Sequence, residues 1–318
     1  MKQEIRQSLA ASTAPSDLQS EEYDFGFFTI GYERRSRFVA SNLLTRTRSL
    51  CAFEYDTKAL AISENKEWAS KNNVLARPLT DYRVDRNGEF RDFIASYIRE
   101  HSPNVEKRFF VDVSSMDRSL IGRLLNSIFE VVEPPFNLRI CYAPALFVEP
   151  DFRFVPAREC AASIPELSGT LGIHQSSLSL ILGLGFEYGV SLGLLEQFEP
   201  DQAVIFKPTG TDDRYDEAVR KANFNFDFGL ENVGLFSYRV DQPLTLFDSL
   251  FSITSNVSML HRVVIAPNGP KIFAALATVV GLFRAPQVAV LRASLAAQPP
   301  VHDVEANGSI VALDFRCS

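Results

Sequence analysis

The feature that most constrains the fold of this chain is an internal repeat with a spacing of about 154 residues. Gly31-Tyr32-Glu33 follows an apolar run, and Gly185-Phe186-Glu187 follows a second such run 154 residues later. Three further apolar segments and one tetrapeptide recur in the same order at nearly the same spacing: 50–54 with 203–207, 82–85 with 238–241 (Tyr-Arg-Val-Asp in both), 110–113 with 264–267, and 139–143 with 288–292. Ordered anchors of this kind predict two copies of one structural unit.

The length of the chain fits two such units. With 318 residues, the chain has room for two domains of ordinary size. We therefore predict a mobile polar tail over 1–22, a first domain over 23–158, a linker rich in Pro, Gly, Ser and Thr over 159–176, and a second domain over 177–318.

Within each copy, short apolar segments alternate with helical patterns. The first copy predicts strands over 27–30, 49–54, 75–79, 108–113 and 138–142, and helices over 36–44, 63–72, 89–100 and 119–131. The strands do not alternate between polar and apolar residues, which is typical of a parallel sheet that is buried on both faces. The fold class predicted is α/β: two tandem Rossmann-like domains with mainly parallel sheets, related by internal duplication.

Each copy is also expected to end in additional strands. Asn307-Gly308 is a hairpin signal between the apolar segments 301–305 and 310–315, which we assign to the second domain. Segments 146–148 and 152–155 are the expected counterpart in the first domain.

Composition and charge exclude several classes of function. The net charge is −7 and basic residues form only short clusters, so binding to duplex nucleic acid is not expected. The four cysteines form no CxxC pair and no cluster with zinc spacing, so no metal site is expected.

The sequence contains no expected signal peptide or membrane span. Residues 1–22 lack the apolar core of a signal peptide. Glu187 interrupts the apolar stretch 177–195, and this stretch predicts a strand, a turn and a helix. We expect a cytoplasmic protein that does not enter a membrane.

Ligands of open parallel sheets bind outside the carboxyl ends of the strands, where the strand order reverses. For the order 3-2-1-4-5, this point lies between the first and fourth strands. In the first copy, the candidate binding residues at this point are Gly31, Tyr32, Glu33, Arg34, Ser114, Ser115 and Arg118. Arg83, which lies past the third strand, is a further candidate. Serine hydroxyls before a helix can cradle an anion, with arginine supplying charge. The alternative is that Ser114, Ser115 and Asp117 merely cap the following helix.

The corresponding candidates in the second copy are Gly185, Phe186, Glu187, Arg239, Asn268, Gly269 and Lys271. Asn268-Gly269-Pro270-Lys271 places flexible backbone and one ammonium group at a helix start, which suits a phosphate; the alternative is a turn with a surface lysine. The spacing Gly183-x-Gly185-x-x-x-Gly189 is not the dinucleotide fingerprint, and no acidic partner follows at the required distance. The sequence therefore identifies no cofactor.

A glutamate follows the first strand in both copies. Glu33 and Glu187 can accept hydrogen bonds from a base or ribose, pair with Arg83 or Arg239, or serve as an acid or base; the alternative is a favourable charge at a helix N-terminus. The sequence contains no Walker A segment, no GxSxG elbow, no HExxH and no kinase signature. It therefore identifies no catalytic residue and leaves open whether a reaction is catalysed.

The segments Asp112-Val113-Ser114-Ser115-Met116-Asp117-Arg118 and Pro267-Asn268-Gly269-Pro270-Lys271 give the chain a resemblance to the CARF family, Rossmann-like sensors of cyclic oligonucleotides in bacterial immunity. Two CARF-like units in one chain resemble SAVED domains. The resemblance implies a role in antiviral defence, a cyclic oligonucleotide as the ligand, and a separate effector protein as the partner, because no effector domain is attached. The glycine and threonine character of the family's loop is missing from the first copy.

Three functions follow as hypotheses. The first is a nucleotide-binding sensor or regulatory module with its ligand held between the two halves. The second is an enzyme acting on a nucleotide-type substrate, with Glu33 or Glu187 as acid or base. The third is a non-enzymatic scaffold subunit of a larger complex. The strand ends of the first copy are richer in arginine and those of the second in glycine and proline, so we expect the copies to have specialised, with the main site in either copy.

Overall fold

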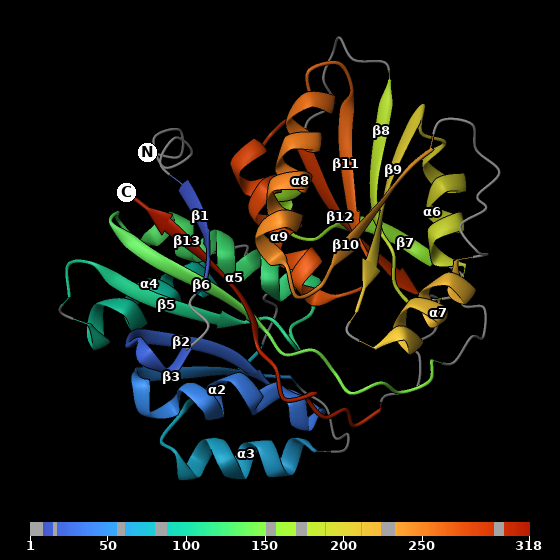
Figure 1. The fold of residues 1–318 in the computed structure, drawn as a ribbon. Coiled ribbons are helices and arrows are strands. Elements are labelled where there is room, and N and C mark those ends of the chain that lie inside the picture. Colours follow the sequence, from blue (N-terminus) through green and yellow to red (C-terminus); the bar gives the residue numbers. More distant parts are fainter. Residues whose placement is uncertain are drawn as a thin grey trace. The chain divides into compact units, whose positions relative to one another are not determined.

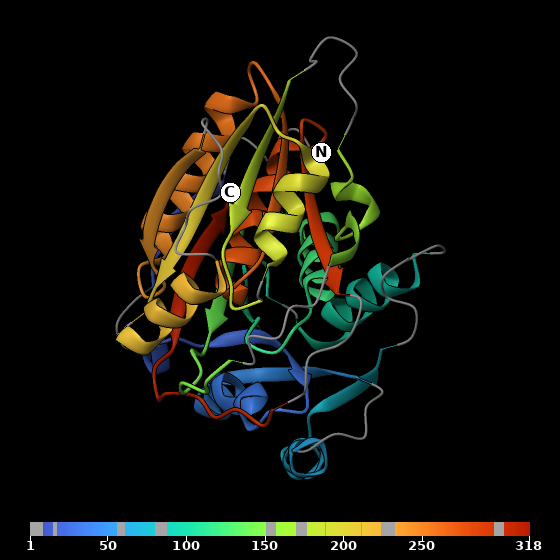
Figure 2. The ribbon, with the colours of Figure 1, turned by 90° about the vertical axis from the view of Figure 1, so that its right-hand side faces the viewer.

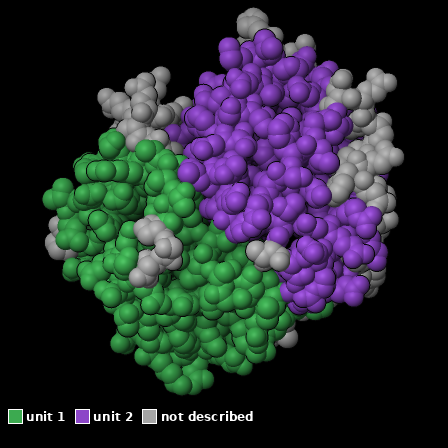
Figure 3. All heavy atoms as spheres, viewed as in Figure 1, with its two compact units in different colours: residues 1–146, 301–318 green, residues 147–300 purple. Residues whose placement is uncertain are grey.

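The computed structural model of the chain describes residues 9–14, 18–55, 61–79, 88–102, 104–150, 157–169, 177–187, 189–210, 212–223, 233–295 and 302–318. The chain divides into two compact units, residues 1–146 with 301–318 (unit 1) and residues 147–300 (unit 2), which are coloured separately in Figure 3. Each unit has a mainly parallel sheet with helices, which confirms the predicted α/β class with two Rossmann-like domains.

The sheet of unit 1, drawn from two sides in Figure 1 and Figure 2, has the strand order β1-β13-β6-β5-β2-β3-β4. The strands β2 to β6 are parallel, and in chain order they stand as 3-2-1-4-5, as expected from the sequence. At the other end, β13 is antiparallel to both β6 and β1. The strands are β1 (Leu9–Thr13), β2 (Tyr23–Ile30), β3 (Thr47–Glu54), β4 (Leu75–Pro78), β5 (Lys107–Asp112), β6 (Phe136–Tyr142) and β13 (Val311–Cys317).

Strand β2 is buried along its whole length because helices cover both of its faces. The rings of Phe25 and Phe27 lie 5.6 and 5.9 Å from Tyr97 of α4, whereas Phe28 lies 5.9 Å from Trp68 of α3. Burial on both faces explains why the sequence of this strand shows no polar alternation. The helices of unit 1 are α2 (Phe38–Leu43), α3 (Ile62–Lys71), α4 (Glu89–His101) and α5 (Arg118–Val131), with 3-10 turns η1 (Leu18–Ser20), η2 (Arg34–Arg37) and η3 (Leu44–Arg46).

The core of unit 1 leaves no room for a side chain at Gly26, in the middle of β2. A Cβ atom there would overlap the buried ring of Phe110 and lie 2.6 Å from Cδ2 of Leu50. We expect Gly26→Ala to lower the free energy of unfolding by about 1–3 kcal/mol, the usual cost of overpacking. Urea unfolding measures this, with Gly31→Ala as the control, because a Cβ at Gly31 would lie 3.4 Å from its nearest atoms. Equal losses in the two variants would contradict the expectation.

The sheet of unit 2 has the order β10-β9-β8-β11-β12-β7, again 3-2-1-4-5 for its five parallel strands, with β7 antiparallel to β12. Leu180 and Leu182 of β8 lie in one apolar cluster with residues of α6 and α7, whereas Phe206 of β9 packs against Phe273 of α9. The strands are β7 (Ala157–Ala162), β8 (Leu178–Gly183), β9 (Gln202–Thr209), β10 (Val233–Arg239), β11 (Arg262–Pro267) and β12 (Val288–Leu295). The helices are α6 (Val190–Phe198), α7 (Asp213–Ala222), α8 (Pro243–Val257) and α9 (Lys271–Arg284), and a 3-10 turn η4 (Pro165–Leu167) follows β7.

The outer strands of the two sheets differ from the sequence-based assignment. Strand β13, which we assigned to the second domain, pairs with β6 in the sheet of unit 1. Strand β7, which lies partly in the expected linker, pairs with β12 in unit 2. A partly buried ion pair across strands accompanies the first difference: Arg139 of β6 donates to both carboxylate oxygens of Asp314 at 2.5 and 2.6 Å.

The segments flanking β13 and β2 also differ from expectation. Asn307-Gly308 forms a bend in which Ser309 N donates to Asn307 Oδ1, and residues 302–305 form no strand. Instead, Leu146 N donates to Glu305 O and Asn307 N to Pro144 O. The expected mobile tail over 1–22 contains strand β1, which pairs with β13, and the 3-10 turn η1.

The stretch 177–195 divides into β8 and the start of α6. Within the described residues, no helix is both long enough and apolar enough to cross a membrane. The described part of the chain also holds no group of three or more His, Cys, Asp and Glu side chains that would suit a metal ion.

Candidate functional site

The carboxyl ends of β2 and β5 in unit 1 lie side by side, because these two strands are parallel neighbours in the middle of the sheet. Gly31 follows β2, and Val113, Ser114 and Ser115 follow β5. A Cβ placed on Gly31 would lie 3.4 Å from the Cβ atoms of Ser115 and Ser36, so the two loops are in close proximity. Two segments that we predicted from the strand order are therefore brought together, and we name them the strand-end site.

Arg35 joins the loops of the strand-end site. Its guanidinium donates to Glu33 Oε2 at 2.9 Å, to the carbonyl oxygen of Ser114 at 3.2 Å and to that of Ala143 at 3.3 Å. The two charged side chains form an ion pair of 2.7 Å and are 11% and 9% exposed. One buried arginine thus holds the loops that follow β2, β5 and β6 in fixed positions.

Asp112, the last residue of β5, is buried beside this arginine. Its Oδ1 accepts hydrogen bonds from the backbone N of Ser114 at 3.0 Å and from the hydroxyl of Ser114 at 2.5 Å. Burial raises the pKa of Asp112 to about 7, although the hydrogen bonds from Ser114 and the charge of Arg35 act in the opposite direction. Near neutral pH this carboxyl group therefore exists in both protonation states.

Ser114 has a structural role in the strand-end site. Besides donating to Asp112, its hydroxyl accepts a hydrogen bond of 2.8 Å from Ala143 N. The capping alternative holds for Asp117, which is the N-cap of α5 and accepts from Leu120 N. The hydroxyl of Ser114 is thus occupied by the protein itself.

Asn65 of α3 binds the loop that follows β2. Its amide nitrogen donates to the carbonyl oxygens of Gly31 and Glu33, each at 2.9 Å, and to Ser36 Oγ at 3.0 Å. These bonds fix the backbone of the loop after β2. Asn65 was not predicted from the sequence, whereas Arg35 and Asp112 lie within the predicted strand-end segments 31–36 and 112–118 but were not among the candidate binding residues.

Three buried oxygen atoms of the strand-end site have no hydrogen-bond partner among the described residues: Asp112 Oδ2, Ser115 Oγ and Asn65 Oδ1. Ser115 and Asn65 contact Gly31, and Asp112 is hydrogen-bonded to Ser114, which precedes Ser115 in the loop after β5. A buried polar group without a partner costs about 1–3 kcal/mol. Such groups therefore call for a partner from outside the described protein, either water or a ligand.

The other predicted residues of the first copy are placed as follows. Tyr32 is half-buried beside Glu33, and burial together with that carboxylate raises its pKa to about 12. Arg34 is exposed and pairs with Asp303 at 2.7 Å and Glu305 at 2.6 Å, so it contacts the C-terminal segment. Arg118 is the first residue of α5, directly after the strand-end site, and Arg83 lies outside the described residues.

The corresponding position in unit 2 is filled by its own backbone. A Cβ on Gly185 would collide with Glu187 Oε2 and lie 2.8 Å from Gly269 N. Gly269 has a φ of +79°, and a Cβ there would collide with the carbonyl oxygen of Leu184. The glycines predicted as ligand contacts thus allow the loop after β8 to pack directly on the loop after β11.

Phe186 stacks on Tyr215 with ring centroids 5.6 Å apart, and Arg239 is exposed and pairs with Asp241 at 2.6 Å. Lys271 is the first residue of α9, and Asn268 is buried with its Nδ2 lacking a partner among the described residues. Among the described residues, the strand ends of unit 1 thus have more buried polar atoms without a hydrogen-bond partner than those of unit 2.

No family model matches this sequence. No curated protein matches it either. Solved structures do match, and one of them is the crystal structure of a candidate methyltransferase from Pseudomonas syringae. It is 13% identical to this chain, covers 40% of this chain and 69% of its own length, and has a TM-score of 0.24. This similarity identifies neither a ligand nor a reaction.

Proposed function

We propose that unit 1 binds a nucleotide-type small molecule at the strand-end site and works as a sensor or regulatory module. The observation that carries this proposal is the group of three buried oxygens without described partners, Asp112 Oδ2, Ser115 Oγ and Asn65 Oδ1, at the reversal of the strand order. Nucleotide ligands of open α/β sheets bind at this position. A ribose or a base edge offers hydroxyl and amino hydrogens that such oxygens accept.

The rigidity of the strand-end site supports binding. Arg35 and Asn65 fix the loops around Gly31 through six hydrogen bonds to Glu33, Ser114, Ala143, Gly31 and Ser36. Loops that are held before the ligand arrives lose little conformational entropy when it binds. We extend the proposal to cyclic oligonucleotides, the ligand class that the resemblance to CARF and SAVED proteins implies, with a separate effector protein as the partner.

Ser115 gives a direct test of this proposal. Its hydroxyl has no partner in the described protein, so Ser115→Ala should leave the free energy of unfolding almost unchanged. If the hydroxyl contacts the ligand, the same substitution should raise the Kd about tenfold, equivalent to about 1.4 kcal/mol. The measurement is thermal unfolding of the protein against mononucleotides, dinucleotide cofactors and cyclic oligonucleotides, followed by titration calorimetry with the compound that raises Tm most.

The matched control is Ser127→Ala. Ser127 lies in α5 and is a second buried serine whose hydroxyl has no partner among the described residues, but it is not at the strand ends. Its substitution should not change ligand affinity. If no compound of the panel raises Tm, the proposal is refuted and the scaffold hypothesis is favoured. Equal losses of affinity in both serine variants would show that Ser115 is not a contact.

A catalytic role is the second candidate, and the pKa of about 7 at Asp112 favours it. An acid or base works best when its pKa lies near the pH at which it acts. Glu33, the residue suggested by the repeat, already pairs with Arg35, which suits a positioning role better. Under this candidate, the protein consumes the nucleotide over time, and Asp112→Asn abolishes turnover while binding persists. Saturable binding without turnover in the wild-type protein would rule it out.

A further inference from the structure

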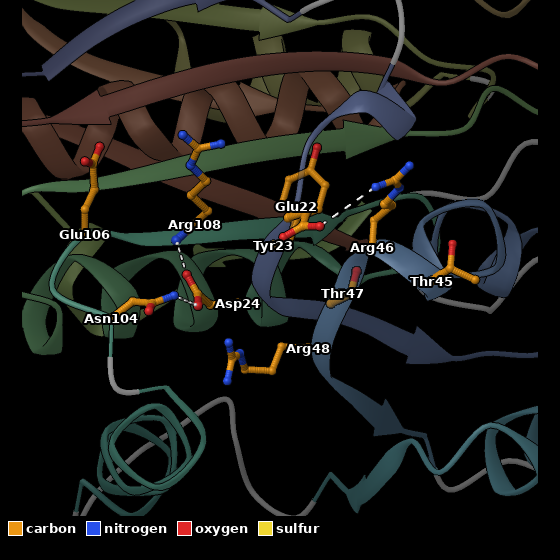
Figure 4. Close-up of a pocket in the computed structure, with 10 residues that line it drawn as sticks. All are labelled: Glu22, Tyr23, Asp24, Thr45, Arg46, Thr47, Arg48, Asn104, Glu106 and Arg108. Carbon is orange, nitrogen blue, oxygen red and sulfur yellow. Dashed lines mark hydrogen bonds and ion pairs between the residues drawn. The ribbon is translucent and has the colours of Figure 1, made fainter.

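A polar cavity lies at the opposite end of the same sheet, away from the strand-end site (Figure 4). Its volume is about 480 Å³, within the usual range for small-molecule sites. It is formed at the amino ends of β5, β2 and β3, together with η3 and the residues just before β5. The lining residues are Glu22, Tyr23, Asp24, Thr45, Arg46, Thr47, Arg48, Asn104, Glu106 and Arg108.

The most buried carboxylate of this cavity is fully occupied by the protein. Asp24 Oδ1 accepts from Ser102 Oγ at 3.0 Å and from Asn104 Nδ2 at 2.5 Å, and Oδ2 accepts from Arg108 N at 3.0 Å. These bonds shape the wall before β5, as the dashed lines in Figure 4 show for Asn104 and Arg108. Asp24 forms no ion pair with an arginine side chain of the described residues.

The two other carboxylates of the cavity, those of Glu106 and Glu22, form no strong ion pair with its arginines within the described residues. Glu106 accepts a hydrogen bond of 2.8 Å from Asn137 Nδ2. Glu22 lies 3.8 Å from Arg46, at the limit for an ion pair, with side chains that are 82% and 46% exposed. An exposed pair of this kind contributes about 0–1 kcal/mol, so a stronger partner readily displaces it.

Arg48 and Arg108 carry guanidinium groups for which the described part of the chain provides no hydrogen bond or ion pair. Both residues are exposed, and in Figure 4 no dashed line reaches the guanidinium of Arg48. Each guanidinium has five N–H donors in a planar fork, a geometry that matches the oxygens of a phosphate group. Together with Arg46, three such groups line one cavity.

We propose that this cavity is a second ligand site, distinct from the strand-end site, which binds a small molecule carrying a phosphate or diphosphate group. Arg48 and Arg108 are the principal contacts, because neither guanidinium has a competing partner in the described protein, and Arg46 adds charge. Charge-assisted hydrogen bonds from arginine forks to phosphate are short and strong. The cavity is concave and flanked by carboxylates, which fits a compact ligand better than a nucleic-acid backbone.

Titration calorimetry with sodium pyrophosphate at constant ionic strength tests this proposal on the full chain. We expect saturable binding to the wild-type protein and a Kd about tenfold higher for Arg48→Gln, with a similar loss for Arg108→Gln. The matched control is Arg316→Gln, which removes the same charge from an exposed residue of unit 1 that does not line the cavity. Arg316→Gln should bind pyrophosphate like the wild type.

Three outcomes would overturn the proposal: no binding of pyrophosphate, unchanged binding in Arg48→Gln, or an equal loss in Arg316→Gln, which would show a general effect of charge. Ser115→Ala separates this site from the strand-end site and should retain pyrophosphate binding. If Ser115→Ala loses it while Arg48→Gln keeps it, the phosphate binds at the strand-end site, which refutes the second site and supports the first proposal. The nucleotide panel tests the strand-end site independently.

Discussion

Asp112→Asn is expected to make the protein more stable than the wild type above about pH 7, although it changes a buried hydrogen-bonded residue. Burial raises the pKa of Asp112 to about 7 in the folded protein, compared with about 3.9 for an unfolded aspartate. Between these values the folded state binds a proton that the unfolded state has released, so wild-type stability decreases as the pH rises through this window. Asparagine keeps the acceptor for Ser114 and carries no charge, so the variant lacks this decrease.

The size of this effect is limited by the width of the window. At about 1.4 kcal/mol for each pH unit, Asp112→Asn would gain at most about 4 kcal/mol over the wild type at about pH 8, and little at about pH 4. Urea unfolding at several pH values measures the difference. Asp24→Asn is the control, because all the hydrogen-bond partners of Asp24 donate to its carboxylate and its substitution should destabilise at every pH. Parallel pH dependence of Asp112→Asn and the wild type would contradict the assignment.

A gain in stability on removal of Asp112 would have a functional meaning. A residue that costs stability in the free protein is typical of a site that is arranged for binding or catalysis. The same substitution should lower the affinity for the nucleotide-type ligand if Asp112 Oδ2 accepts a hydrogen bond from that ligand. Stability and affinity would then change in opposite directions, which a purely structural carboxylate does not produce.

The parallel core of both units could be predicted from the sequence because the information for it is local. Strand β2 and its counterpart β8 are short apolar runs followed by glycine, and the repeat places the remaining strands in the same order. The sheet membership of β13 is not local: Arg139 and Asp314 are 175 residues apart, and no short pattern around Asn307-Gly308 specifies which sheet receives the strand. The hairpin signal was therefore interpreted as joining two strands of the second domain.

The proximity of the loops after β2 and β5 could also be predicted, whereas the contacts made by their residues could not. Glycine and polar residues after β2 and β5 indicated the position, since the strand order fixes where ligands bind. The adjacent arginines Arg34 and Arg35 look equivalent in the sequence, but Arg35 is buried in the site and Arg34 pairs with Asp303. Asn65 lies within a helix and gives no signal at all, because its role depends on the packing of α3 against the loop after β2.

Arg139→Ala is expected to lower the free energy of unfolding by about 3–5 kcal/mol, the usual cost of removing one partner of a buried ion pair. Arg139 is 2% exposed, donates to both oxygens of Asp314 and to the hydroxyl of Tyr23, and lies 3.3 Å from Glu21. Removing it leaves the carboxylate of Asp314 uncompensated between β6 and β13. Urea unfolding gives the loss, and hydrogen exchange should show early opening of residues 311–317.

A double substitution separates the ion pair from the packing of β13. Arg139→Met with Asp314→Leu replaces both charges by apolar side chains, and we expect it to recover most of the stability lost in Arg139→Ala, because no charge is left buried alone. Arg316→Ala, on an exposed side chain of the same strand, should change stability by less than about 0.5 kcal/mol. If the double variant is as unstable as Arg139→Ala, Arg139 stabilises the fold through Tyr23 and Glu21 rather than through the ion pair with Asp314. If all three variants match the wild type, apolar residues such as Leu313 and Phe315 hold the last strand of the chain in the first sheet without help from the charges.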